Sequence, residues 1–219
     1  MASLKRGPAS RLLHRGAEGN TVEFARSFLT SRLEGFEKDM HICLKGVKAK
    51  GQSRVTHAYF PALMACCGML EYLAALYQGK VGETLNNAKI SAYANEYLHQ
   101  PDYAPEAIRI LFDALRNPIA HRSIATGVWK DMHKDFRGRR LTWKVLAGSA
   151  RPAIRLVDEV REIRRDSPWP CRYTHRVHVH LGSLWRDIAD SVPRYLNALA
   201  SDQKLQKHFD ACMHELYPD

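Results

Sequence analysis

The sequence has few cysteines, which staple very small proteins together, and few glycines and prolines, which are abundant in unfolded chains. Its five cysteines are an odd number and none forms a C-x-x-C pair, which excludes a disulfide framework and a zinc ribbon. With 13 glycines, 10 prolines and 45% hydrophobic residues, the composition is typical of a folded soluble protein. No apolar run follows Arg11 and Arg15, so no secretory signal is expected and we predict a cytoplasmic location.

A membrane-spanning segment is not expected either. The longest apolar run, residues 59–78, has Glu71 near its centre, and a carboxylate in hydrocarbon costs about 2.5 kcal/mol or more. Because the run is apolar on every side, it predicts a central helix surrounded by others in a soluble bundle, without a membrane partner. Within this helix, Cys66 and Cys67 are expected to be buried as small hydrophobic side chains.

Positive charge is in excess and is unevenly distributed. The formal net charge is +10, and residues 137–176 carry eleven basic side chains against four acidic ones. Residues 1–19 carry four basic and one acidic side chain, whereas residues 177–219 carry four and six. A segregated basic surface predicts a phosphate-rich partner such as RNA; the alternative is a solvated face that only confers solubility.

Hydrophobic periodicity predicts a mainly α-helical fold. Residues 1–19 are expected to form a flexible basic leader, and the segments that follow have apolar residues at helical spacing. The predicted helices cover residues 21–47, 59–78, 83–99 and about 105–121, with Gly79 ending the second and Pro105 starting the fourth. Joined by short links, these segments predict a helical bundle over residues 20–128.

From Trp129 onward the pattern changes from helical spacing to alternation. Polar and apolar residues alternate in segments 141–146, 153–157 and 173–181, which predicts a small antiparallel sheet or hairpin appended to the bundle. Two more helices are predicted at residues 183–200, interrupted by Pro193, and 202–216. We expect these C-terminal helices to pack on the bundle and to complete a second region over residues 129–219.

The end of the fourth predicted helix contains an arginine, an asparagine and a histidine at short spacing. Arg116 and His121 are separated by four residues, and Asn117 follows Arg116. The spacing alone is uninformative, because 21 arginines and 11 histidines give about three such pairs by chance. Its position at the end of the fourth helix, after an amphipathic run and with a polar residue behind the arginine, resembles the Arg-x4-6-His motif of the HEPN superfamily (higher eukaryotes and prokaryotes nucleotide-binding).

The resemblance implies a HEPN-like helical bundle and a metal-independent endoribonuclease of a toxin, phage-defence or RNA-processing system. Such an enzyme leaves a 2′,3′-cyclic phosphate and a 5′-hydroxyl. By resemblance, His121 is the general acid and base, Arg116 holds the phosphate, and Asn117 and Glu71 are supports. It further implies a homodimer in which two copies of the motif face each other, with an antitoxin or regulatory protein as an additional partner.

The residue types suit this chemistry. An imidazole titrates near neutral pH and can accept the proton of a 2′-hydroxyl, while a guanidinium presents a planar fork to phosphate oxygens. Because RNA supplies its own nucleophile, no metal or cofactor is required. On a straight helix Arg116 and His121 point about 140° apart. Pro118 removes the hydrogen bond to the Ala114 carbonyl, so we expect a kink or a loosened last turn there.

Glu71 is the only charged residue of the predicted helix 59–78. A carboxylate in an apolar helix needs a partner, and we predict that Arg116 is that partner. The alternative is an ion pair with another arginine, or a helix edge that reaches water. For His121 and Arg116 the alternative is a helix-terminal imidazole and a solvated surface arginine.

Further basic, aromatic and imidazole side chains surround the predicted strands. Five basic residues are predicted to contact the RNA backbone: Arg122, Arg137, Arg139, Arg140 and Lys144. Three tryptophans interleave with arginines and either stack on unpaired bases or cover the core of the sheet: Trp129, Trp143 and Trp169.

His175, His178 and His180 lie close to Cys171 and are of the types that bind zinc. On a strand, His178 and His180 share one face and His175 points to the other. A three- or four-ligand site would need a bend, so we predict sheet-surface histidines and no metal site.

The leading prediction is a HEPN-like endoribonuclease with an appended sheet, acting on RNA as a homodimer. The alternative of another class is a non-catalytic HEPN-like module that binds RNA or a nucleotide, or that is the partner of a toxin. A third interpretation is a helical scaffold whose basic stretch only confers solubility. A steep salt dependence of RNA binding separates the third from the first two.

Overall fold

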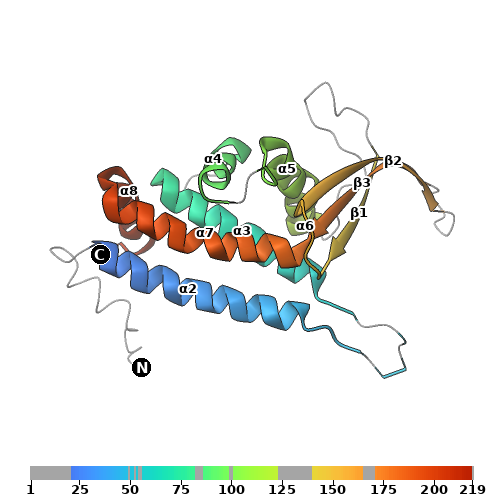
Figure 1. Ribbon diagram of the computed structural model, residues 1–219, viewed down its shortest axis with the longest axis horizontal. Helices are drawn as coiled ribbons and strands as arrows, with labels where there is room; N and C mark the ends of the chain where they lie inside the picture. The colour runs from blue at the N-terminus through green and yellow to red at the C-terminus, as the bar shows by residue number, and fades with distance from the viewer. Residues whose placement is uncertain are drawn as a thin grey trace.

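The computed structural model of the chain describes residues 21–48, 50–51, 53, 56–81, 86–98, 101–122, 140–164 and 171–218 (Figure 1). For residues 121–122, 158–164 and 171–172 it describes the backbone only. The elements are α2 (Thr21–Leu44), α3 (Tyr59–Gln78), α4 (Asn87–Tyr97), α5 (Pro105–Arg109), η1 (Ile110–Arg116), α6 (Asn117–Arg122), β1 (Leu141–Leu146), β2 (Ile154–Arg164), β3 (Cys171–His180), α7 (Leu181–Ser201) and α8 (Gln203–Leu216). The described chain is therefore mainly α-helical with a small sheet, as predicted, and the leader at residues 1–19 lies outside it.

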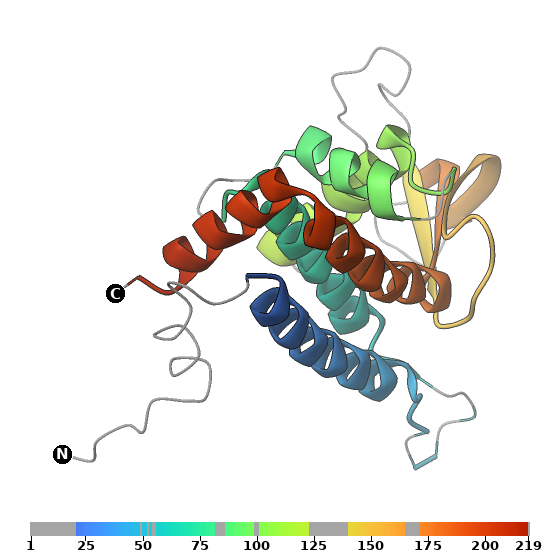
Figure 2. The same cartoon turned by 60° about the vertical axis from the view of Figure 1, so that its left-hand side comes forward.

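Helix α3 is the centre of the helical part. It packs against α2, α4, α7, α8 and η1, and ten of its side chains are buried. Figures 1 and 2 show α2, α3 and α7 side by side along their lengths. Within the described residues, α3 is the one helix long and apolar enough to cross a membrane by length and composition. Its position among other helices confirms the predicted central helix.

The end of α3 requires a glycine for two reasons. Gly79 has a φ of 75°, in the left-handed region where a side chain is strained, and the N–H of Lys80 donates to the Ala75 carbonyl. A Cβ at Gly79 would also lie 2.9 Å from the His208 ring of α8. The His208 ring is held against α3, because its Nδ1 lies 2.7 Å from the Tyr77 carbonyl oxygen. Gly79 thus lets α8 approach the end of α3.

Two other helices begin or end at points the periodicity did not locate. Helix α2 ends at Leu44 rather than near residue 47, and an isolated antiparallel bridge joins Val47 to Thr56. Helix α4 begins at Asn87, because the side chain of Asn86 accepts a hydrogen bond from the Lys89 N–H and caps it.

The sheet is mixed, with strand order β1-β3-β2. Strands β2 and β3 pair antiparallel as predicted, but β1 pairs parallel with β3, so the prediction of a wholly antiparallel sheet was wrong. Alternation of polar and apolar residues specifies which face is buried and not the direction of the neighbouring strand. Strands β2 and β3 also extend further than predicted, with a register shift between Asp158 and Glu162.

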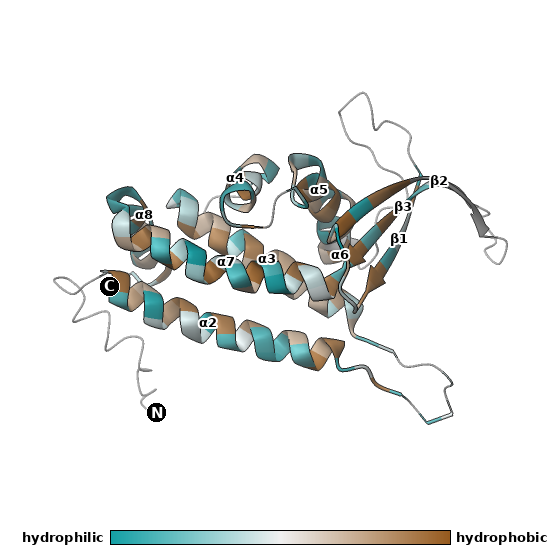
Figure 3. Cartoon of the chain, in the orientation of Figure 1, coloured by the Kyte–Doolittle hydropathy of each residue, from teal (hydrophilic) through white to brown (hydrophobic). Residues whose placement is uncertain are grey.

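The C-terminal helices are part of the bundle. Helix α7 packs on α2, α3 and α4, and α8 packs on α3 and α2. Pro193 lies inside α7 on its exposed side and does not interrupt it, contrary to the prediction. Polar and apolar residues alternate around α7 in Figure 3, and burying its apolar stripe offsets the roughly 3 kcal/mol cost of an interior proline. Buried side chains before residue 128 and after it form one continuous cluster.

Candidate functional site

The predicted partner of Glu71 is present. An Nη2 hydrogen of Arg116 is donated to Glu71 Oε2 at 2.6 Å, which joins the last residue of η1 to the central helix α3. The two side chains are 27% and 22% exposed, so water screens this pair only in part. The ion pair fixes where the guanidinium of the motif lies.

Asn117 provides the second contact to the same guanidinium. An Nη1 hydrogen of Arg116 is donated to Asn117 Oδ1 at 2.9 Å. Asn117 begins α6, and position 121 comes four residues later in this helix, so the two positions share a helix face. The hydrogen bond therefore draws the guanidinium toward the side of the helix on which position 121 lies.

Arg116 belongs to a π-helical segment that the sequence did not predict. The N–H of Asn117 donates to the carbonyl of Phe112, five residues back. Pro118 follows, and a proline has no N–H and clashes with the carbonyl four residues before it, here that of Ala114. The expectation was a kink or a loosened last turn, and the structure has wider, π-helical turns that precede the proline, within consecutive helical segments from Pro105 to Arg122. Such segments are frequent at functional sites.

The pair lies against the apolar interior. Cys67, one turn before Glu71 in α3, is fully buried, and this burial raises the pKa of its thiol. The Glu71 carboxylate raises that pKa further, whereas the Arg116 charge lowers it. Burial likewise raises the pKa of Cys66, so both thiols are protonated and unreactive at neutral pH. This confirms the predicted burial of the two cysteines.

Other residues predicted for the site are placed in part. His121 and Arg122 end α6, and their side chains lie outside the described residues. Arg137 and Arg139 lie outside them altogether. Arg140 and Lys144 are exposed, the first beside Thr174 and the second opposite His178 on β3. The structure thus brings together Glu71, Arg116 and Asn117, and places two basic residues of the expected RNA-binding set on the sheet.

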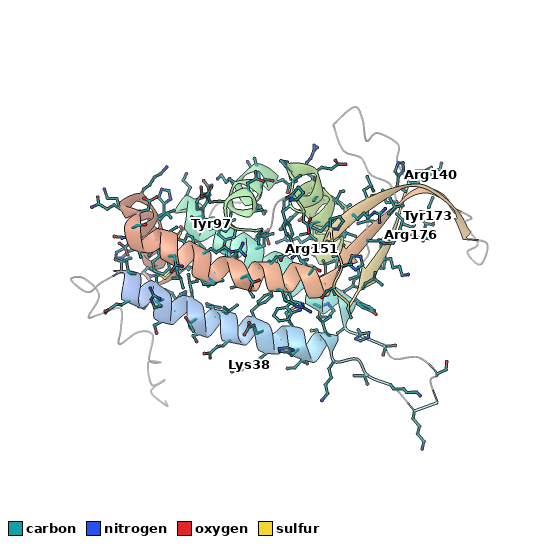
Figure 4. The ribbon with its side chains drawn as sticks, viewed as in Figure 1. Lys38, Tyr97, Arg140, Arg151, Tyr173 and Arg176 are labelled. Atoms are coloured by element: carbon teal, nitrogen blue, oxygen red, sulfur yellow. The ribbon has the colours of Figure 1, made fainter. Side chains whose placement is uncertain are left out.

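A second cluster, of one arginine and two aspartates, was not predicted from the sequence. Arg151 lies in the loop before β2 and is labelled in Figure 4. It contacts the buried carboxylates of Asp102 and Asp187, the first at 2.8 Å. Its Nη2 donates to Asp187 Oδ1 at 2.6 Å, and the hydroxyl of Tyr103 donates to Asp187 Oδ2 at 2.6 Å. These carboxylates raise the pKa of Arg151 above its usual range. The one available signal was Asp187, an acid within the apolar stripe of α7.

An open, polar cavity of about 240 Å³ lies between the ends of α3 and α4 and the start of α8, and it does not include Glu71, Arg116 or Asn117. It is lined by Tyr77, Gln78, Glu96, Tyr97, Asp202, Lys204, Leu205 and His208. None of the residues predicted for catalysis borders it.

The described side chains include no group of three or more His, Cys, Asp or Glu residues that could hold a metal ion. The ring of His175 lies next to the Thr174 hydroxyl, with Nδ1 and Oγ1 2.7 Å apart. The rings of His178 and His180 lie 6.3 Å apart in an edge-to-face arrangement. Trp143 lies against Phe60 of α3, 5.2 Å between ring centroids, and so covers the core of the sheet.

Comparison with known proteins found no family model that matches the sequence. No curated protein and no solved structure proved similar to the chain.

Proposed function

We propose that the chain is a metal-independent endoribonuclease of the HEPN type. The observation that supports this proposal is the placement of Arg116, held by Glu71 and Asn117 at the start of the short helix that ends with His121 and Arg122. An arginine has five N–H donors, and these two contacts use two of them. Donors on the guanidinium are thus left for a phosphate while two partners fix its orientation.

The reaction uses the 2′-hydroxyl of the substrate as its nucleophile. The imidazole of His121 accepts the hydroxyl proton as the 2′-oxygen forms a bond to phosphorus, and the bond from phosphorus to the 5′-oxygen breaks. The 5′-oxygen leaves with a proton from the second imidazole of a dimer or from water. Arg116 stabilises the negative charge that develops on the non-bridging oxygens. The products are a 2′,3′-cyclic phosphate and a 5′-hydroxyl.

Each remaining residue has a stated part in this proposal. Glu71 and Asn117 are positioning residues, because they touch Arg116 and not the substrate. Arg122, Arg137, Arg139, Arg140 and Lys144 contact the RNA backbone. The enzyme works in the cytoplasm as a homodimer, and an antitoxin or regulatory protein controls it. Size-exclusion chromatography tests the dimer, since a strict monomer cannot form a site from two copies.

The direct test is cleavage of a defined RNA in the presence of EDTA. We expect the wild-type protein to cut RNA, to leave DNA of the same sequence intact, and to give fragments with 5′-hydroxyl ends. His121→Ala and Arg116→Ala should each lower the cleavage rate at least 100-fold, because each removes a group that acts in the transition state. Matched controls are His214→Ala on α8 and Arg26→Ala on α2, whose side chains are exposed.

Two outcomes contradict the assignment. If His121→Ala cleaves at the wild-type rate, that residue is not the acid and base. If the activity requires a divalent ion and disappears with EDTA, the metal-independent mechanism is wrong.

A second candidate function is a non-catalytic module that binds RNA. The observation that favours it is the short Glu71 contact, because a carboxylate at 2.6 Å already satisfies one arm of the Arg116 guanidinium. In that case the wild-type protein binds RNA without cutting it, and Arg116→Ala changes thermal stability more than RNA affinity.

A further inference from the structure

The outward face of the sheet gathers positive charge from all three strands. Lys144 of β1 lies opposite His178 of β3, and Arg155 of β2 lies opposite the same histidine from the other side. Side chains directly opposite each other on neighbouring strands point to the same face. One row across the sheet therefore reads Lys144, His178, Arg155.

Two more arginines extend this row along the sheet. Arg176 lies two residues before His178 in β3, and side chains two apart on a strand share a face. Arg140 precedes β1, where its carbonyl accepts hydrogen bonds from the N–H groups of Thr174 and His175, so it stands beside Thr174 on this face. Figure 4 shows Arg140 and Arg176 at the same end of the sheet. We call these five residues the cationic sheet face: Arg140, Lys144, Arg155, Arg176 and His178.

The opposite face of the sheet packs against the hydrophobic core. Leu141, Val145, Val177, Val179 and Ile154 alternate with the cationic residues along the strands and are buried. By contrast, Arg140, Lys144 and Arg155 are exposed. The cationic sheet face is thus the side of the sheet that is turned away from the helices.

Three charges on this face, those of Arg140, Lys144 and Arg155, have no opposite charge paired with them among the described side chains. Neighbouring strands are about 4.8 Å apart, and like charges directly opposite each other are destabilising. The Nε2 atom of His178 is enclosed and has no hydrogen-bond partner in the described part of the chain.

The pKa of His178 is consistent with an excess of positive charge around it. Burial lowers the pKa of its imidazole below the usual value. Four neighbouring basic groups lower it further: Arg176, His180, Lys144 and Arg155. An anion placed over Lys144, His178 and Arg155 would relieve this repulsion, because it would supply an opposite charge that the described side chains do not place there.

We propose that the cationic sheet face binds the phosphate backbone of RNA. Arg155, Arg176 and His178 thereby join Arg140 and Lys144 in one surface, and the identification of the polymer as RNA rests on the proposed ribonuclease function. The large hydrophobic side chains that are exposed in the described chain are Ile42, Val47 and Tyr217, and none of them lies on this face, so the exposed side chains described here offer nothing apolar to insert into a lipid surface. Its chemistry fits a polyanion in water.

The binding does not depend on base sequence. Trp143, the aromatic residue of β1, is partly buried against Phe60, and it lies next to Lys144 along the strand and therefore on the opposite face of the sheet. Contacts to phosphates position a nucleic acid without reading its sequence, and they make affinity fall with salt by about 0.7 log units per log unit for each phosphate on a single strand.

The experiment measures binding of an uncleavable probe as a function of salt. The probe is a fluorescein-labelled single-stranded RNA of about twenty nucleotides with 2′-O-methyl groups, followed by fluorescence anisotropy. The test protein is the double variant Lys144→Gln/Arg155→Gln. The matched control is Lys204→Gln/Lys207→Gln, which removes the same charge from exposed positions of α8.

We expect the salt slope of the sheet variant to be less steep than that of the wild type by about 1.4, and its affinity at 0.1 M salt to be about 20-fold weaker. The control variant should match the wild type. The α8 variant should melt like the wild type, and the sheet variant should melt at the same temperature or slightly higher, because its substitutions are exposed and remove like charges that face each other. A second pair, Lys144→Arg/Arg155→Lys, keeps the charge and should keep the affinity.

The proposal is overturned if the sheet variant and the α8 variant bind the probe equally well. It is also overturned if the sheet variant loses binding to vesicles of anionic lipid while RNA binding is unchanged. Cleavage of RNA by the wild type with unaltered binding by the sheet variant would reject this surface and leave the ribonuclease proposal standing. Loss of binding by the sheet variant in a protein that never cuts RNA would do the reverse.

Discussion

Two arginines of this protein hold carboxylates, and their surroundings differ. Arg151 contacts two buried aspartates from different parts of the chain, and one of these, Asp187, also accepts the Tyr103 hydroxyl. Arg116 contacts one half-buried glutamate and its own neighbour Asn117, and its Nε has no partner among the described residues. The first cluster joins the loop before β2 to α7 and to the segment before α5; the second joins two helices.

The difference indicates that Arg151 stabilises the fold, whereas Arg116 still has hydrogen-bond donors that could bind a ligand. At Arg151 the carboxylates outnumber the arginine, so its charge is fully compensated by the protein. At Arg116 one carboxylate and Asn117 orient the guanidinium, and among the described residues these two contacts use two of its five N–H donors. Substitutions in the first cluster should therefore change stability, and substitutions in the second should change activity more than stability.

The largest effect is expected from Asp187→Ala. This change leaves the Tyr103 hydroxyl without its acceptor and Arg151 with one carboxylate, and breaking a buried pair in this way costs about 3–5 kcal/mol. In thermal unfolding we expect the midpoint to fall by roughly 10 °C. Asp190→Ala, at an exposed position of α7, is the control and should unfold like the wild type. An unchanged midpoint for Asp187→Ala would mean that the cluster does not stabilise the fold.

Glu71→Gln should have a smaller effect on stability and a clear effect on cleavage. The amide keeps the shape and one acceptor but loses the charge, so we expect about 1–2 kcal/mol lower unfolding free energy in urea. Cleavage should fall about tenfold in kcat with little change in KM, since Glu71 orients Arg116 and does not touch RNA. Glu34→Gln, exposed on α2, is the control. Equal cleavage by both variants would remove Glu71 from the proposed mechanism.

Tyr103→Phe tests the first cluster more gently. It removes one hydroxyl that donates to the buried Asp187 and leaves both ion pairs of Arg151 intact. The expected loss is about 1.5 kcal/mol in urea unfolding, the lower end of the usual range for one hydrogen bond to a charged group, because Arg151 still binds the aspartate. A loss as large as that of Asp187→Ala would show that the hydroxyl, and not the arginine, is the main partner of the aspartate.

The smallest effect concerns the pH dependence of folding at His178. Its pKa is lowered in the folded state by burial and by Arg176, His180, Lys144 and Arg155, so the unfolded chain binds the proton more readily. Stability from this group is complete above about pH 6.5, the usual imidazole pKa, and is lost as the pH falls below that value. Melts at pH 5 to 8 should thus show a weaker acid destabilisation for His178→Gln than for wild type. His214→Gln, exposed on α8, should follow the wild type.

The helices were predictable because each buries a stripe whose period is in the sequence. Helix α3 has the predicted boundaries and ends at Gly79, and the ion pair between Glu71 and Arg116 follows from the cost of burying a lone carboxylate. These inferences need only the local pattern and one strong electrostatic argument.

Other features depend on the order in which distant segments meet. Nothing local specifies that β1 lies parallel to β3, and Arg151 finds Asp102 and Asp187 across 49 and 36 residues of chain. The π-helical turns before Pro118 also escape the pattern, because buried residues from Ile110 to Leu115 suit either kind of turn. Tertiary packing decides each of these.

Strand β3 runs into α7 without a linker: His180 ends the first and Leu181 starts the second. The middle strand of the sheet and a principal helix of the bundle are therefore one stretch of backbone. A truncated gene product that stops at residue 128 would lack α7 and leave the apolar sides of α2 and α3 open to water. We expect such a fragment to aggregate, so the sheet cannot be exchanged between proteins as a detachable module.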